Sequence, residues 1–151
     1  MNPQQQVQEI NLPDVYAYLK NKLMVFDDPA CIDTDIVMAG KKFKCVVIDA
    51  FDAKLNHNMD FTEGDNGWHE KWDVPKDVLC ASSDSPPFER KFNLMHEAIE
   101  SLMMWLAGYD YNHAHDVANA YEKMFRLEYA NRRPDMDRRY YRLRNGKLVN
   151  P

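Results

Sequence analysis

The sequence predicts an α+β domain in which a small antiparallel sheet or hairpin packs on a helical hairpin. One observation is the run FKCVVIDAF at residues 43–51, whose β-branched and aromatic side chains favour a strand. A second is a pair of apolar stretches with helical periodicity between residues 87 and 131, joined by a short turn at Gly108. An all-α bundle, in which residues 43–51 are merely extended, is the alternative.

The composition indicates one folded domain. Hydrophobic residues make up 45% of the 151 residues and aromatic residues 12%, and the formal net charge is only −5. These values are typical of globular proteins and far from those of disordered chains. We assign residues 1–131 to a single α+β domain and residues 132–151 to a basic C-terminal tail.

The chain shows no sign of export or membrane insertion. The N-terminal residues lack the basic and apolar regions of a signal peptide, and no window approaches the roughly 18 consecutive apolar residues of a membrane span. Cys31, Cys45 and Cys80 are widely spaced, which indicates ordinary buried thiols in a reducing compartment. We therefore expect a cytoplasmic protein.

Turn residues divide the first half of the chain into elements. Residues 12–26 predict a helix, with Pro13 in its first turn and an Asp-Asp-Pro sequence after its end. Two apolar runs flanking Ala39 and Gly40 predict a β-hairpin over residues 35–51. Residues 52–87 mix Gly, Pro, Asn and Asp with isolated aromatics and predict an irregular connection.

Two amphipathic helices are predicted in the second half. The first begins after Pro87, and the second begins near Asn112 as an N-cap and continues to about Asn131, because Pro134 discourages helix beyond it. Apolar residues at helical spacing cover one broad side of the first helix. These are Phe92, Met95, Ile99, Leu102, Met103 and Leu106.

Ionisable residues stand at the edges of both apolar faces. His96 and Glu100 are one turn apart on the first helix, and His115 and Glu122 are two turns apart on the second. In an antiparallel pair with its turn near Tyr109, His96 lies opposite Glu122, and the small Ala118 leaves space between the helices. Four potential ligands therefore converge on one gap.

Buried carboxylates must be neutralised by protonation, a partner or a cation. Two imidazoles and two carboxylates suit zinc or a related divalent metal, so we predict a metal site at His96, Glu100 and His115. Glu122 is either a fourth ligand or the outer carboxylate that orients an imidazole. Glu97 is the predicted catalytic general base for the water that such a metal activates. Without metal, His96 and Glu122 should be hydrogen-bonded across the hairpin.

The sequence motifs of the two predicted helices resemble those of small proteins encoded by bacteriophages and prophages. Their shared pattern is His-Glu-x-x-Glu on one helix, a Gly turn, and then Tyr-x-x-Ala-His-x-x-Ala-x-x-x-Glu. The residues that carry it here are His96, Glu97, Glu100, Gly108, Tyr111, Ala114, His115, Ala118 and Glu122. The resemblance implies a minimal zincin-like fold, with a short sheet beside the helix that carries the ligands. Zincins have a second histidine where this chain has Glu100, and the added negative charge weakens the metal as a Lewis acid.

Two functions follow as hypotheses. The first is a phage-encoded zinc-dependent hydrolase or peptidase-like protein in the cytoplasm of the infected bacterium, acting on a peptide or host protein. The alternative is a non-catalytic phage accessory protein that binds and inhibits or redirects a host protein, with the His/Glu cluster as a buried polar network.

The tail holds six arginines and one lysine against two aspartates. We expect it to be solvated or to pack on the acidic body rather than to contact nucleic acid.

Overall fold

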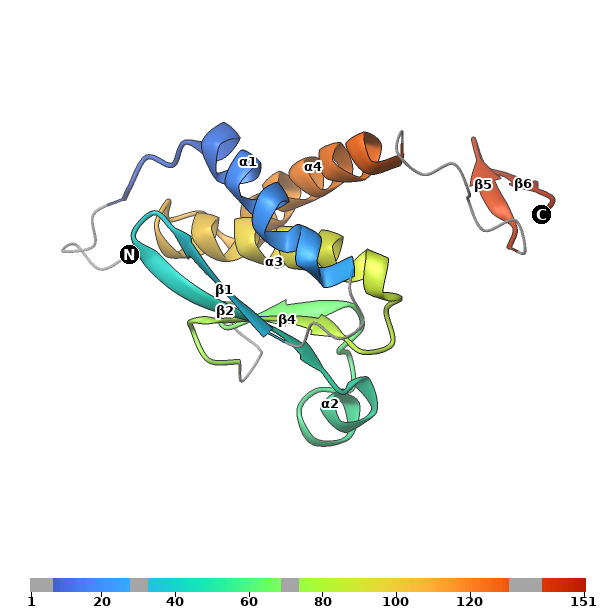
Figure 1. Cartoon of the computed structure of the whole chain (residues 1–151), viewed down its shortest axis with the longest axis horizontal. Helices are drawn as coiled ribbons and strands as arrows, with labels where there is room; N and C mark the ends of the chain where they lie inside the picture. Colours follow the sequence, from blue (N-terminus) through green and yellow to red (C-terminus); the bar gives the residue numbers. More distant parts are fainter. Residues whose placement is uncertain (1–6, 28–32, 69–73, 131–139) are drawn as a thin grey trace.

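The α+β prediction is confirmed, and the all-α alternative is excluded. The computed structural model describes residues 7–27, 33–68, 74–130 and 140–151. Within these ranges it contains four α-helices, a four-stranded mixed sheet and a separate two-stranded hairpin (Figure 1). The sheet lies on one side of the central helix α3, and α1 and α4 cover α3 from the other side (Figure 1).

The predicted β-hairpin is present. Strand β1 (Asp33–Met38) pairs antiparallel with β2 (Lys41–Ile48) across a turn in which Ala39 and Gly40 both have positive φ, 50° and 76°. Turns of this kind match the right-handed twist of the strands they join. The hairpin ends earlier than predicted because Asp49 caps helix α2 (Ala50–Asn56), its carboxylate accepting the Asp52 N–H at 2.9 Å.

The prediction of an irregular connection over residues 52–87 was wrong in part. Besides α2, this region forms β3 (Gly64–Asn66) and β4 (Val78–Ser82). The sheet order is β1-β2-β4-β3, and β2 pairs parallel with β4, so the sheet is mixed rather than antiparallel. Strand β4 shows no apolar–polar alternation because it is almost wholly buried, and β3 has only the weak strand formers Gly-Asp-Asn.

The N-terminal helix is shorter than predicted. Helix α1 (Leu12–Leu23) is capped by Asn11, and the 3₁₀-helix η1 (Met24–Asp27) completes the segment. Both pack against α3. Phe26 in η1 is fully buried, which explains why its apolar pattern extended the predicted α-helix.

The helical hairpin consists of α3 (Pro87–Trp105) and α4 (Tyr111–Ala130). Gly108 has φ of 73°, and the Tyr109 N–H donates to the Met103 carbonyl at 3.0 Å, which satisfies one of the last carbonyls of α3. The predicted N-cap Asn112 was wrong: the Asp110 carboxylate accepts the His113 N–H at 2.8 Å. Asn131, the predicted end of α4, lies outside the described residues.

Helix α3 is buried around its whole circumference. Every residue from Lys91 to Met103 is buried, whereas the sequence predicted one apolar side with polar residues at its edge. The main core joins α3 to α1, α4 and the inner face of the sheet. A smaller core lies on the outer face, where Ala50, Ala53 and Phe61 surround Cys80.

Three further predictions concern the cysteines, the membrane and the tail. Cys45 and Cys80 are buried, as predicted, and Cys31 lies outside the described residues. Among the described residues, no helix has the length and apolar character needed to cross a membrane. The tail contains a short hairpin of β5 (Arg142–Arg144) and β6 (Lys147–Val149) around an Asn145-Gly146 turn, and what it contacts stays a prediction.

Candidate metal centre

Three side chains on the helical hairpin direct ligand atoms at one point. His96 Nε2 and His115 Nδ1 each lie 2.9 Å from Glu100 Oε2, and the two nitrogens are 3.2 Å apart. Ligands about 2.1 Å from a tetrahedral zinc ion are separated by roughly 3.4 Å. The triangle is thus close to the size of one face of such a site, and this group could hold a metal ion.

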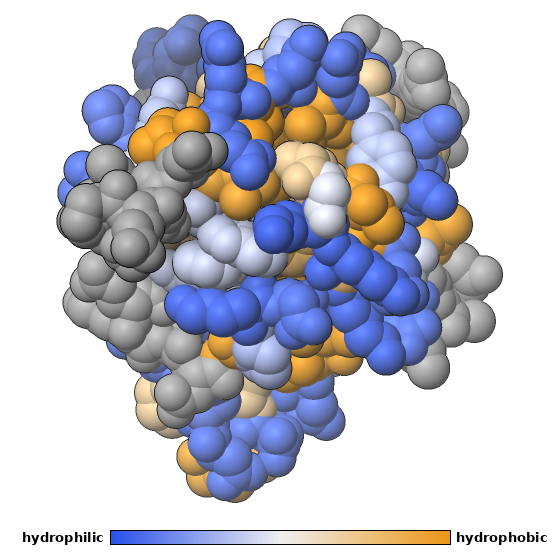
Figure 2. Space-filling model, turned by 90° about the vertical axis from the view of Figure 1, so that its left-hand side faces the viewer, coloured by the Kyte–Doolittle hydropathy of each residue, from blue (hydrophilic) through white to orange (hydrophobic). Residues whose placement is uncertain are grey.

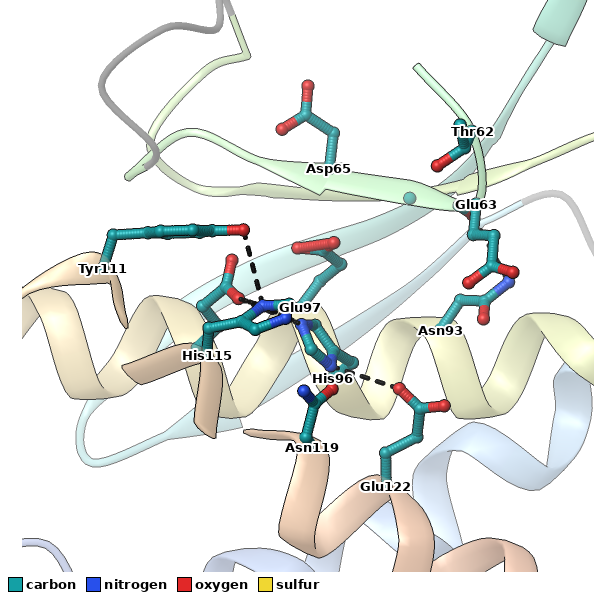
Figure 3. A pocket seen from close by; sticks show the side chains of 12 residues that line it. Thr62, Glu63, Asp65, Asn93, His96, Glu97, Tyr111, His115, Asn119 and Glu122 are labelled. Atoms are coloured by element: carbon teal, nitrogen blue, oxygen red, sulfur yellow. Dashed lines mark hydrogen bonds and ion pairs between the residues drawn. The ribbon is translucent and has the colours of Figure 1, made fainter. Parts of the chain in front are cut away.

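The two helices bring the triangle together as predicted from their antiparallel arrangement. His96 and Glu100 are neighbours one turn apart on α3, and His115 reaches them from the second turn of α4. Ala114 and Ala118 on α4 are fully buried, so no large side chain separates the helices. Figure 3 shows His115 and His96 directed toward each other across this gap.

Glu122 lies at the other nitrogen of His96. Its Oε1 is 3.1 Å from His96 Nδ1, so the imidazole ring separates it from the three converging atoms (Figure 3). Nδ1 makes no aligned hydrogen bond, and the contact is therefore an ion pair rather than a directed bond. Glu122 also accepts the Arg126 Nε–H at 2.8 Å, and Arg126 binds Glu89 through two further hydrogen bonds. Glu122 therefore occupies the position of an outer carboxylate that orients the imidazole.

The charges of the cluster support one another in the metal-free state. Burial acts to lower the pKa of His96, but the close contacts with the Glu100 and Glu122 carboxylates and the charges of Glu97 and Glu100 outweigh it and raise that pKa to about 10. Burial acts to raise the pKa of Glu100, but His96 and His115 hold it below its usual range. Without metal, His96 is an imidazolium that balances the buried carboxylates.

Glu97 faces the sheet, not the solvent. It is 9% exposed, and its Oε2 accepts a hydrogen bond from the Asn66 side chain at 2.7 Å. Burial and the negative charge of Glu100 raise its pKa to about 8, against the opposing effect of His96. A carboxyl group that titrates near neutral pH can both accept and donate a proton.

Residues of β3 and its neighbourhood complete the site, and the sequence analysis missed them. Asn66 Nδ2 donates to both Glu97 and Glu100. Gly64 permits β3 to pass over Glu97, since a Cβ there would lie 2.6 Å from the Cys80 carbonyl oxygen and 3.2 Å from Glu97 Cγ. On α4, Tyr111, which belongs to the sequence motif, places its hydroxyl 3.4 Å from His115 Nδ1. Only contacts across the fold reveal the roles of Gly64 and Asn66, because β3 carries no recognisable strand pattern.

The other described histidines lie away from this cluster. His113 is exposed, and His69 lies outside the described residues. His57 differs, because it follows α2 and its Nε2 lies 3.0 Å from Asp65 Oδ2 in a part-buried pair. Burial raises the pKa of Asp65 to about 6, although hydrogen bonding to His57 and to the Asn66 N–H opposes this shift.

The three converging atoms open onto a cavity of about 280 Å³ between α3, α4 and β3. His115 is 39% exposed, so the cluster is accessible to solvent from the α4 side. The cavity is lined by Thr62, Glu63, Gly64, Asp65, Asn93, His96, Glu97, Glu100, Tyr111, His115, Asn119 and Glu122. Most of these residues are polar, so the cavity suits a hydrophilic substrate or hydrated ion.

Comparisons with protein-family models, with curated proteins and with solved structures find no match to this chain. The resemblance to phage-encoded zincin-like proteins therefore stays a prediction that rests on the motifs of α3 and α4. The face of the molecule drawn in Figure 2 carries hydrophilic and hydrophobic patches side by side.

Proposed function

We propose that this protein binds one divalent metal ion, zinc by preference, at His96, Glu100 and His115 and uses it to hydrolyse a peptide or amide bond. The observation that carries the proposal is the convergence of His96 Nε2, Glu100 Oε2 and His115 Nδ1 within 3.2 Å of one another. A catalytic zinc ion takes three protein ligands of these types around one point.

The donor set supports zinc. Neutral imidazoles and a carboxylate are ordinary zinc ligands, and catalytic zinc sites combine three protein ligands with one open position. Here the open side of the triangle faces the solvent-accessible cavity. A structural zinc site would close this fourth position with another side chain.

Each neighbouring residue has a role in this proposal. Glu122 holds the Nδ1 side of His96, which fixes the ring so that Nε2 points at the ion. Glu97 takes a proton from the attacking water and returns it to the leaving group, a role that its place in the lining of the same cavity supports. When bound, the metal supplies Lewis acidity to the water and the carbonyl oxygen.

The substrate and setting are proposed from the resemblance and from the cavity. A polar cavity beside the three ligands suits a peptide segment, and a phage protein would meet such segments in host proteins in the bacterial cytoplasm. The proposed activity is therefore that of a small metallo-hydrolase or peptidase-like protein.

Metal content tests this proposal directly. We expect elemental analysis of untagged protein to find about one equivalent of zinc or a related metal, and expect added chelator to lower the melting temperature. His115→Ala should remove the metal, while His113→Ala, an exposed histidine on the same helix, should retain it. Glu97→Gln should keep the metal and lose hydrolysis of a casein-derived peptide mixture.

The second candidate is the non-catalytic accessory protein. One observation favours it: Glu97, Glu100 and Glu122 all have protein donors already, from Asn66, the two histidines and Arg126. The cluster could therefore be a buried polar network that fixes the helical hairpin. A metal-free protein whose melting temperature changes with neither zinc nor chelator would support this function over hydrolysis.

A further inference from the structure

Asn66 donates side-chain hydrogen bonds to both Glu97 and Glu100. It is 1% exposed and lies at the end of the edge strand β3. Its Nδ2 donates to Glu97 Oε2 at 2.7 Å and to Glu100 Oε1 at 3.0 Å. An amide nitrogen has two N–H groups, so both of its donors are used.

The orientation of the Asn66 amide is fixed from its other end. Asn66 Oδ1 accepts the backbone N–H of Trp68 at 2.9 Å. A backbone N–H can only donate, so the oxygen must face Trp68 and the nitrogen must face the carboxylates. The amide cannot exchange its two ends without losing all three hydrogen bonds.

The backbone around Asn66 is held as firmly as its side chain. The Asn66 N–H donates to Asp65 Oδ1 at 2.7 Å, and Asn66 pairs with Leu79 in the sheet. Trp68 stacks on Trp105 of α3 with ring centroids 4.7 Å apart, and its Nε1–H donates to the Lys76 carbonyl at 3.0 Å. These contacts attach the Asn66–Trp68 turn to the helix that carries His96 and Glu100.

We propose that Asn66 is the positioning residue of the metal centre, its single amide directing Glu100 at the two histidines and Glu97 into the cavity. The inference deepens the proposed function and rests on it. Glu100 uses Oε2 for both histidines and Oε1 for Asn66, so its carboxylate plane is fixed by donors on both oxygens. Because the side chain of glutamate has three rotatable bonds, removing one set of donors lets the carboxylate turn away.

The same amide separates the two carboxylates while neutralising neither. A positively charged residue at position 66 would compete with a metal for Glu100, and a carboxylate would repel both glutamates. A neutral donor holds them in place and leaves their negative charge for the ion.

The test uses the metal ion itself as the probe, without any substrate. Zn²⁺ affinity is determined by competition with a chelating dye, and Co²⁺ absorption spectra report the coordination geometry. We expect Asn66→Ala to weaken Zn²⁺ binding by about 10- to 100-fold, the usual effect of losing an outer partner, and to change the Co²⁺ spectrum. The matched control is Asn93→Ala, another buried asparagine that lines the cavity but bonds to the Glu63 carbonyl and Ser85.

Asn93→Ala should lower the melting temperature while keeping the wild-type Zn²⁺ affinity within about twofold and the wild-type Co²⁺ spectrum. Should Asn66→Ala fail to fold, Asn66→Asp keeps the shape and the acceptor for Trp68 but removes both donors, and its Co²⁺ spectrum should still differ from wild type. Wild-type affinity and spectrum in the Asn66 variants would overturn this inference and leave the proposed function intact. A wild-type protein that takes up neither ion would overturn both.

Discussion

Two histidine–carboxylate pairs lie on opposite sides of strand β3, and they differ in the charges around them. His96 and Glu100 face the inner cavity at 2.9 Å, and His57 and Asp65 face the outer core at 3.0 Å. His96 also contacts Glu122 and lies near Glu97, and its pKa rises to about 10. Asp65 has His57 as its main partner, and burial raises its pKa to about 6.

A short distance between one histidine and one carboxylate is not sufficient for a metal site. Both pairs are at hydrogen-bonding distance, but only the inner pair has a second imidazole within reach of the same oxygen. The outer pair sits beside Phe61, Cys80 and other apolar residues, where a metal would find no third ligand among the described residues. We therefore expect the inner and outer pairs to respond differently to mutation, metal and pH.

The largest difference should appear when each histidine is removed. Losing an outer partner of a metal site costs about 10- to 100-fold in metal affinity, and His96→Ala, which removes a proposed direct ligand, should cost more. It should also destabilise the metal-free protein by about 3 kcal/mol, because the buried carboxylates of Glu100 and Glu122 lose the imidazole that they contact. Chemical denaturation in chelator and zinc titration measure the two effects.

His57→Ala is the matched variant for the outer pair. We expect about 1 kcal/mol of destabilisation, because Asp65 can protonate when it loses its partner. Zinc affinity should stay at the wild-type value. A loss of zinc binding in His57→Ala equal to that in His96→Ala would contradict the distinction between the two pairs.

Gly64→Ala should disturb the side of β3 that faces His96 and Glu100, because it displaces the strand. A Cβ at this position would lie 2.6 Å from a backbone oxygen of β4, which cannot move without shifting the sheet. We expect a destabilisation of about 2 kcal/mol together with weaker zinc binding. Gly40→Ala is the comparison for a glycine with no atom within 4 Å of the added Cβ, where the positive φ alone sets a smaller cost and zinc affinity should not change.

The pH dependence of the metal-free protein should also separate the pairs. Glu97 has a folded-state pKa of about 8, above its usual 4.5. Its contribution to stability is therefore complete below about pH 4.5 and is lost as the pH rises toward 8. His96, raised from 6.5 to about 10, contributes stability that is complete below pH 6.5 and lost toward pH 10. Melting temperatures in chelator should therefore fall between about pH 5 and 9.

Glu97→Gln should remove the lower part of this fall in melting temperature. A wild-type melting temperature that rises with pH would contradict the raised pKa values of Glu97 and His96.

Asp65→Asn should have the smallest effect. Its carboxyl pKa is raised from 3.8 to about 6, so the variant should flatten the profile only between about pH 4 and 6. Thermal melts at half-unit intervals would resolve the two windows.

The sequence by itself determined the α3–α4 hairpin and three of its polar residues. Helical periodicity placed His96 and Glu100 one turn apart, and a short Gly turn placed His115 on the opposing helix. These relations depend on spacing along the chain, which a regular helix converts directly into position. The β1–β2 hairpin was predictable for the same reason, because the Ala39-Gly40 turn sets its register.

Only the tertiary structure decided which side of the site each remaining group occupies. Glu97 follows His96 directly in the sequence, and nothing in its spacing shows that β3 covers it. Asn66 belongs to a three-residue strand whose propensity is low, and it becomes functional through contacts to residues more than 30 positions away. Local spacing fixes neighbours on one helix, whereas the packing of a sheet edge against that helix depends on the burial of the whole core.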